Sequence, residues 1–340
     1  RINTNSTDKA MVDSTQLERL NVVKARALVE KTFPEQDFEV EVKNSAVLIS
    51  NQETIFVYAK NEKISALAIA LTITACKNSW NLILDEPDNK VLTQIAGLQD
   101  DCSLWIVDGD SLAPHPQRGS DELKSQSIDP LIRNLLEKNH CVVTFENGKV
   151  KGELKGLPIA EVVTGPDGES HLEVGVGTYD REAHKIVNYN EPVETTLERI
   201  SQEVSKYRNK DSVVHPLNRV ARPNWLIHEV MSAGSEIGVT DLKRVPCPIE
   251  PISVSDSLPA SAIAKKNNKL ILLTAYTGAD LEAVPVAAQL LNSYPADEIW
   301  FLHPQKDDYS AIRRQAEHLK VPTSFISVPE PWPTAPSMNH

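Results

Sequence analysis

The sequence has 340 residues, of which 41% are hydrophobic and 24% charged, and its formal net charge is -12 at pH 7. This composition excludes a wholly disordered chain and a general affinity for polyanions, so a nucleic-acid partner would need a local basic patch. No apolar stretch approaches the roughly 18 residues of a membrane span, and the first residues lack the apolar core of a signal peptide. The four cysteines form no CxxC pair, which favours free thiols. We therefore expect a cytoplasmic protein without a membrane partner, and the sequence does not indicate its oligomeric state.

Hydrophobic periodicity predicts an α/β fold with several domains. The first domain, 14–115, opens with an amphipathic helix at 14–31 and two extended runs, 38–49 and 54–58, that read as a hairpin. From residue 66 onward, short apolar strands alternate with helices. This alternation is typical of βαβ units whose parallel sheet is buried on both faces.

The second domain, 120–190, is predicted to be an α+β unit. A helix at 121–139 precedes three extended stretches that are separated by turn-forming Asn-Gly and Pro-Asp-Gly sequences, which favours an antiparallel meander. A helix at 180–187 closes the unit. This order of elements resembles a degenerate restriction-endonuclease-like core, in which acidic residues on adjacent strands hold a divalent metal.

The last two domains are a helical basic segment, 191–250, and a second α/β unit, 251–332. In the latter, helix-length segments separate three short apolar runs, and such connectors join parallel strands, not hairpins. We therefore predict three parallel strands and two helices between 269 and 328. Pro285 shifts the expected start of the first of these helices toward Val284. The two α/β units share too few residues to predict a repeat.

Three stretches carry a resemblance to known proteins. They are Leu172-Glu173-Val174-Gly175-Val176-Gly177, His215-Pro216-Leu217-Asn218-Arg219 and Gly278-Ala279-Asp280-Leu281. Together they resemble a family of uncharacterised conserved hypothetical proteins from actinobacteria, over residues 45–330. The resemblance implies one folded multi-domain unit, and it assigns no catalytic residue.

Acidic residues on the predicted central strands suggest metal-assisted phosphodiester hydrolysis. The candidates for catalysis are Glu153, Glu161, Glu173 and Asp180. Such hydrolysis needs oxygen ligands for a cation such as Mg²⁺, and a basic group that positions the attacking water. A lysine is expected two residues after the acid, but Gly175 stands there, and Lys155 could replace it only from another strand. Arg181 is the candidate phosphate partner beside this set.

Six basic residues against two acidic ones make 199–222 the conspicuous basic segment of an acidic chain. Its candidates for gripping a phosphate or a nucleic-acid strand are His215, Asn218, Arg219 and Arg222. The alternative is that these arginines pair with acidic surfaces of neighbouring domains and act as a clamp.

Two loops follow predicted parallel strands, at the place where open α/β sheets bind ligands. Thr277 and Asp280 lie in the loop after the strand that ends near Ala275, and Asp108-Gly109-Asp110 holds the analogous place in the first domain. Either loop could bind a small polar ligand or be only a capped turn.

The sequence thus predicts that the central unit binds a phosphate-bearing ligand, a nucleotide or a nucleic-acid segment, with metal-dependent phosphodiester hydrolysis as one form of this function. The alternative is a non-catalytic scaffold or protein-interaction module. Basic side chains that face an open acidic cleft would favour the first hypothesis. Basic side chains that are already paired inside the protein would favour the second.

Overall fold

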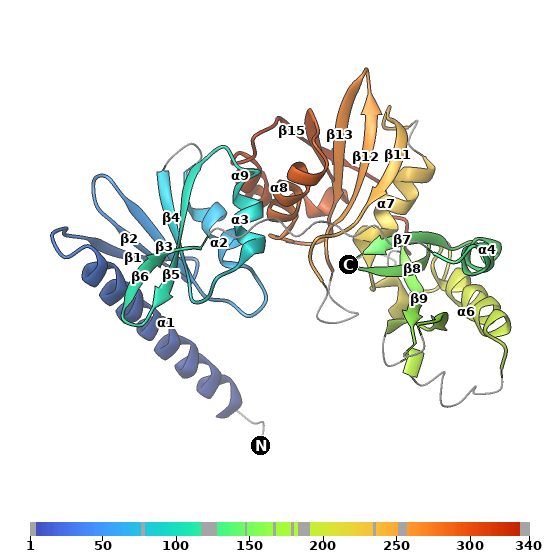
Figure 1. Ribbon diagram of the computed structural model, residues 1–340, viewed down its shortest axis with the longest axis horizontal. Helices are drawn as coiled ribbons and strands as arrows, with labels where there is room; N and C mark the ends of the chain where they lie inside the picture. The colour runs from blue at the N-terminus through green and yellow to red at the C-terminus, as the bar shows by residue number, and fades with distance from the viewer. Residues whose placement is uncertain are drawn as a thin grey trace, which may run out of the picture. The chain divides into compact units, whose positions relative to one another are not determined.

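The computed structural model describes residues 5–75, 79–116, 128–146, 148–165, 168–177, 180–182, 191–233, 236–250 and 257–333, with side chains from residue 16 onward. In these residues the chain is a mixed α/β protein with three sheets (Figure 1). It divides into two compact units, Arg1–Ser120 with Ser310–Lys320 and Asp121–Tyr309 with Val321–His340. No helix in the described ranges is long and apolar enough to cross a membrane.

The first unit holds a six-stranded sheet in the order β1-β2-β3-β4-β5-β6. Its strands are β1 (Glu39–Lys43), β2 (Ala46–Ser50), β3 (Ile55–Ala59), β4 (Ser79–Leu84), β5 (Asp101–Asp108) and β6 (Ser111–Pro114). As predicted, β3, β4 and β5 are parallel neighbours, and helices α2 (Ala66–Ile73) and α3 (Asn89–Ile95) connect them. Helix α1 (Asn5–Thr32) packs Ala25, Leu28 and Val29 against one face of the sheet.

One prediction for this unit is wrong, and for a second position the structure supports one of two alternatives. The run 38–49 is itself a hairpin, because β1 and β2 pair around Asn44 and Ser45, which both have positive φ. Strand β6 pairs antiparallel with β5, so Asp108-Gly109-Asp110 lies in a tight hairpin turn with Gly109 at φ 62°. Of the two alternatives for Asp108-Gly109-Asp110, the structure therefore supports the turn.

The central sheet of the second unit has the order β10-β9-β8-β7, and all its neighbours are antiparallel, which confirms the predicted meander. Its strands are β7 (Val142–Glu146), β8 (Lys149–Leu154), β9 (Leu157–Thr164) and β10 (Ser170–Val174). Helices α4 (Pro130–Lys138) and α6 (Val193–Tyr207) cover its apolar face. The described residues give no support for a restriction-endonuclease-like core. Residues 121–127 and 183–187 of two predicted helices lie outside the described residues.

The second sheet of this unit has the order β11-β12-β13-β14-β15. Strands β13 (Lys269–Ala275), β14 (Glu298–His303) and β15 (Thr323–Ser327) are parallel, as predicted. Helix α8 (Ala283–Ser293) follows β13 and begins beside Val284, as expected from Pro285. Two antiparallel strands, β11 (Thr240–Val245) and β12 (Ala260–Lys266), were not predicted. Helix α7 (Arg222–Ser232) packs on β12 and β13.

The two mixed sheets are built on the same plan. Each begins with a helix, α1 or α7, and continues with three strands that pair antiparallel in chain order. Two further strands then follow in parallel, each after a helix: α2 and α3 in the first sheet, α8 and α9 (Ser310–Ala316) in the second. The likeness lies in the order and direction of the elements.

Candidate functional site

One face of the central sheet carries the predicted acidic residues. The register pairs Thr144 with Lys151, Lys151 with Glu161, and Glu161 with Glu173. Residues that are directly opposite on neighbouring strands share a face, so these four side chains form one polar row. Glu153 lies on the same face, because the hydroxyl of Thr144 donates to its Oε1 at 3.3 Å.

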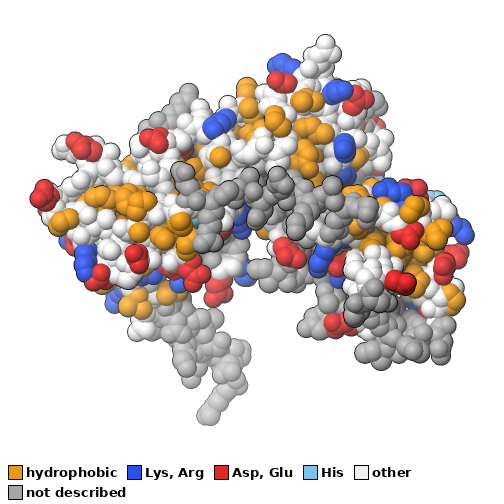
Figure 2. Space-filling view, viewed as in Figure 1, with side chains coloured by type: hydrophobic (Ala, Val, Ile, Leu, Met, Phe, Trp, Pro, Cys, Tyr) orange, Lys and Arg blue, Asp and Glu red, His pale blue; other side chains and the backbone are white. Residues whose placement is uncertain are grey.

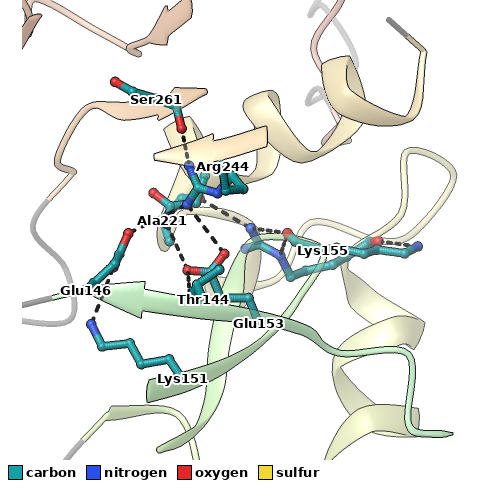
Figure 3. A network of polar contacts seen from close by, with 10 residues as sticks. Thr144, Glu146, Lys151, Glu153, Lys155, Ala221, Arg244 and Ser261 are labelled. Atoms are coloured by element: carbon teal, nitrogen blue, oxygen red, sulfur yellow. Dashed lines mark hydrogen bonds and ion pairs between the residues drawn. The ribbon is translucent and has the colours of Figure 1, made fainter. Parts of the chain in front are cut away.

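Glu153 is bound by an arginine from the other sheet of the same unit (Figure 3). Arg244 on β11 places Nη2 3.5 Å from Oε2 of Glu153 and 3.7 Å from Oε1 of Glu146, while its Nη1 donates to the Ser261 carbonyl at 3.1 Å. The Glu153 side chain is only 3% exposed. Burial raises the pKa of Glu153, and the positive charge of Arg244 opposes this rise. Arg244 therefore ties β8 to the five-stranded sheet through a buried ion pair.

The other acidic candidates also have partners. Glu161 accepts ion pairs from Arg181 at 3.0 Å and from Lys149 at 3.3 Å. His171 lies 3.4 Å from Glu173, and the carboxylate of Asp180 accepts the backbone N–H of Val176 at 2.7 Å. The described residues contain no group of three His, Cys, Asp or Glu side chains arranged to hold a metal ion.

Lys155 does not serve the acidic set. Its ammonium donates to the carbonyl of Arg208, at the C-terminal end of α6, at 2.8 Å. Arg208 in turn is fully buried, and its guanidinium lies 4.3 Å from the centre of the Trp225 ring. The guanidinium donates five hydrogen bonds to the carbonyls of Lys155, Leu217, Val220 and Ala221. This part of the basic segment organises the chain around it.

His215 and Asn218 serve the same loop. The His215 ring stacks on Tyr207 with 3.8 Å between ring centres, and its Nδ1 accepts the backbone N–H of Leu217 at 3.3 Å. The amide of Asn218, which is buried, donates to the Val213 carbonyl at 3.4 Å. These contacts give both predicted ligand residues a role in holding the turn before α7.

Arg219 and Arg222 are less enclosed than Arg208, His215 and Asn218. Arg222 donates to the Asn218 carbonyl at 2.9 Å and lies 4.7 Å from the centre of the Trp332 ring. Burial lowers the pKa of Arg222, and the nearby carboxylates of Glu330 and Asp307 offset only part of this shift. Arg219 is exposed, and its guanidinium makes no ion pair or hydrogen bond with the residues that the structure describes.

Arg222 is close enough to Asp307, four residues after β14, for the two charges to interact, and Arg219 interacts in the same way with Arg222. Tyr276 and the loop that holds Thr277 and Asp280 follow β13, and His303 is the last residue of β14. The backbone N–H of Tyr276 donates to the Leu302 carbonyl at 3.0 Å, so the two strand ends are adjacent. We call Arg219, Arg222, Thr277, Asp280 and His303 the carboxyl-edge site, because ligands of open α/β sheets bind at this edge.

His303 has a buried nitrogen without a partner. The residue is 2% exposed, and its ring stacks on Tyr276 with 5.4 Å between ring centres. Nδ1 lies 2.9 Å from the Pro304 carbonyl oxygen, which can only accept, so Nδ1 carries the hydrogen of the neutral ring. Nε2 is then an acceptor, and it has no hydrogen-bond partner among the described residues.

Asp280, like His303, has a buried polar atom without a hydrogen-bond partner among the described residues. Its Oδ1 accepts the backbone N–H of Glu282 at 3.0 Å, while Oδ2 is buried and has no hydrogen-bond partner in the described part of the chain. Burial raises the pKa of this carboxyl from 3.8 to about 7. The loop after β13 and the end of β14 thus each hold one buried polar atom without a hydrogen-bond partner among the described residues, which is unusual for buried groups.

Part of this site was predictable from the sequence. Thr277 and Asp280 were expected at a strand–loop–helix junction, and the structure places them there. His303 was missed, although a polar residue that ends a predicted parallel strand was the available signal. Comparison with protein-family models, with curated proteins and with solved structures found no match.

The raised pKa of Asp280 predicts how its replacement will act. Because the folded state favours the protonated carboxyl, its contribution to stability is full below about pH 4 and is lost as the pH rises through 7. Asp280→Asn keeps the shape without the charge. The variant should therefore have a larger free energy of unfolding than the parent. This difference should grow from pH 5 to pH 8 and reach at most about 4 kcal/mol. Urea unfolding at both pH values measures this, and an equal difference at both would contradict it.

Proposed function

We propose that the chain binds a small phosphate-bearing ligand at the carboxyl-edge site. Two buried atoms support this most: Nε2 of His303 at the end of β14 and Oδ2 of Asp280 in the loop after β13. Neither has a hydrogen-bond partner in the described part of the chain. The exposed guanidinium of Arg219 adds a positive charge that no described residue neutralises. Arginine is well suited to phosphate because its planar fork can donate two hydrogen bonds to one group.

The proposed ligand class is smaller than the one expected from the sequence, which also included nucleic-acid segments. Nucleotides remain within the proposed ligand class. We do not propose metal-dependent phosphodiester hydrolysis by Glu153, Glu161, Glu173 and Asp180 with Mg²⁺ as cofactor. The described contacts of these carboxylates are with basic side chains, a hydroxyl, an amide and a backbone N–H. On the face shown in Figure 2, basic and acidic side chains are interspersed, so we expect recognition of a small group and not of a long polyanion.

Replacing Arg219 tests the proposed function. Metal-free calorimetric titrations with pyrophosphate, ribose 5-phosphate and AMP should show saturable binding of at least one compound. Arg219→Ala should weaken that binding about tenfold, because it removes one charge-assisted contact. Lys210→Ala is the matched control, since Lys210 is an exposed cation of the same segment, and it should bind like the parent. No saturable binding, or equal loss in both variants, would contradict the proposal.

A second candidate is the interaction module, and an exposed apolar row on α1 favours it. Leu17, Leu20 and Val23 are 53%, 64% and 66% exposed, at helical spacing. A second copy of the chain is the partner to test first. Light scattering should then show a concentration-dependent dimer that Leu17→Glu with Leu20→Glu abolishes. A parent that stays monomeric at high concentration would remove this candidate.

Two expectations from the sequence remain predictions. The three cysteines in the described ranges, Cys102, Cys141 and Cys247, are free thiols, which is compatible with the reducing compartment expected for a cytoplasmic protein. The resemblance to an actinobacterial family also stays an expectation.

A further inference from the structure

Strand β1 is an open edge of the six-stranded sheet. It is the end strand of the sheet, and in the described part of the chain it pairs only with β2. Four of its five residues are exposed, and one of them, Val42, is a hydrophobic side chain that is 40% exposed. An end strand carries backbone N–H and C=O groups that no neighbouring strand satisfies, so it can pair with a strand of another molecule.

The turn between β1 and β2 determines which backbone groups face the open edge. Both turn residues have positive φ, which is the type I′ geometry of a two-residue hairpin loop. In such a loop the flanking residues, Lys43 and Ala46, form a hydrogen-bonded pair, and bonded and non-bonded pairs then alternate along the ladder. The N–H and C=O groups of Val40 and Val42 therefore point away from β2, and no hydrogen bond outside the strand ladders reaches them among the described residues.

The charged side chains of β1 lie together on one face of the sheet. Glu39, Glu41 and Lys43 alternate with the two valines, and successive side chains of a strand point to opposite faces. Val40 packs against the apolar cluster that α1 shares with the sheet, so the charged side chains are on the face away from α1. All three are exposed. The order of charges is negative at the start of the strand and positive at its end.

This order makes the edge complementary to itself. In an antiparallel pair of two β1 strands, one register uses all the outward backbone groups: Val40 lies opposite the partner's Val42, and both such pairs exchange hydrogen bonds. The same register places Glu39 opposite the partner's Lys43 at each end of the pair, and Glu41 opposite the partner's Glu41 at its centre. Opposite charges that lie directly across attract and like charges repel, so attractive contacts outnumber the repulsive one.

We propose that the open edge of β1 binds the same edge of a second copy of the chain, antiparallel and in this register. A two-fold interface must match itself, and the charge order of β1 does. The exposed Val42 side chain is then covered by the partner's Val40. This surface is separate from the carboxyl-edge site and from the apolar row of α1. Because a strand of five residues buries little area, the dimer is weak and depends on concentration.

Two charge reversals test the pairing. Glu39→Lys and Lys43→Glu each place like charges opposite one another in a dimer of identical chains, so each variant should dimerise at least about tenfold more weakly than the parent. An equal mixture of the two variants should regain the affinity of the parent, because each reversed side chain then faces an opposite charge. Sedimentation velocity over a concentration series measures this. A dimer that neither reversal weakens, or a mixture that does not recover, would overturn the inference.

A matched pair of milder substitutions tests the register. Glu39→Gln and Glu41→Gln remove the same charge from the same face of the same strand. Glu39→Gln should weaken the dimer about fivefold, because it removes the attraction to Lys43, whereas Glu41→Gln should strengthen it about threefold, because it removes the central repulsion. Effects of equal size and sign would show that only net charge matters, and they would contradict the proposed pairing.

Hydrogen exchange locates the interface without any substitution. The amide hydrogens of Val40 and Val42 should exchange rapidly in dilute protein and more slowly as the dimer forms, while that of Glu41, which pairs with β2, should not change. A parent that stays monomeric, or a dimer that leaves the exchange of Val40 and Val42 unaltered, would refute the β1 interface. Neither result bears on phosphate binding at the carboxyl-edge site, so the two proposals fail separately.

Discussion

Replacing Arg208 with Ala should lower the free energy of unfolding of the second unit by about 3–5 kcal/mol. The guanidinium is fully buried and donates five hydrogen bonds to four backbone carbonyls, so its removal leaves those carbonyls without donors and a void beside Trp225. Burial is the main cause that lowers the pKa of Arg208 to about 9, against the opposing charge of Glu153, which indicates how well the group is shielded from water. Urea unfolding monitored by tryptophan fluorescence measures the loss.

Two controls separate this role from charge alone. Arg199→Ala removes an exposed arginine of α6 that pairs with Glu191, and it should cost less than about 1 kcal/mol. Arg208→Lys keeps the charge but not the planar fork, so it should recover less than half of the lost stability. If Arg208→Ala unfolds within about 1 kcal/mol of the parent, the structural role of this arginine is wrong.

Replacing Arg244 with Met should also cost about 3–5 kcal/mol, because it leaves the buried carboxylate of Glu153 without its cation. Burial already disfavours the charged form of Glu153 and raises its pKa, so removing the positive charge of Arg244 disfavours that form further. Adding Glu153→Gln removes the buried charge, so the double variant should regain at least half of the loss. A double-mutant cycle from four unfolding curves gives the coupling.

A matched pair on the same sheet serves as the control for this cycle. Lys265 and Asp241 are 3.0 Å apart on adjacent strands, and both are more than half exposed. Their coupling should lie below about 1 kcal/mol. Equal coupling energies for the two pairs would show that Arg244 does not clamp the sheets through a buried charge.

The parallel strands were predictable because a fully buried strand is a short apolar run. Strands β13, β14 and β15 have this form, and the helix-length connectors between them exclude a hairpin. Strands β11 and β12 were missed because the first is half exposed and polar and the second is rich in alanine. The β1–β2 turn was missed because Asn44 and Ser45 form it without a glycine.

The roles of the basic residues could not be read from their number. Arg208 and Arg219 lie eleven positions apart in one basic segment, yet the first is buried among carbonyls and the second is exposed. The guanidinium that becomes buried is the one that meets backbone carbonyls from separate segments of the chain. The local sequence around an arginine does not encode where those carbonyls lie. His303 was missed for a related reason: only the fold places its ring beside those of Tyr276 and Phe325, with one nitrogen that has no partner among the described residues.

Nitrogen-15 spectra of histidine-labelled protein, titrated with ribose 5-phosphate, test the location of the ligand most directly. His303 reports the carboxyl-edge site, and His171 reports the acidic face of the central sheet through its contact with Glu173. We predict that the Nε2 signal of His303 shifts and saturates, because the nitrogen gains a hydrogen-bond donor, while the signals of His171 stay in place. A saturable shift of the His171 signals with an unchanged His303 signal would contradict the account. The ligand would then bind at the acidic residues of the central sheet.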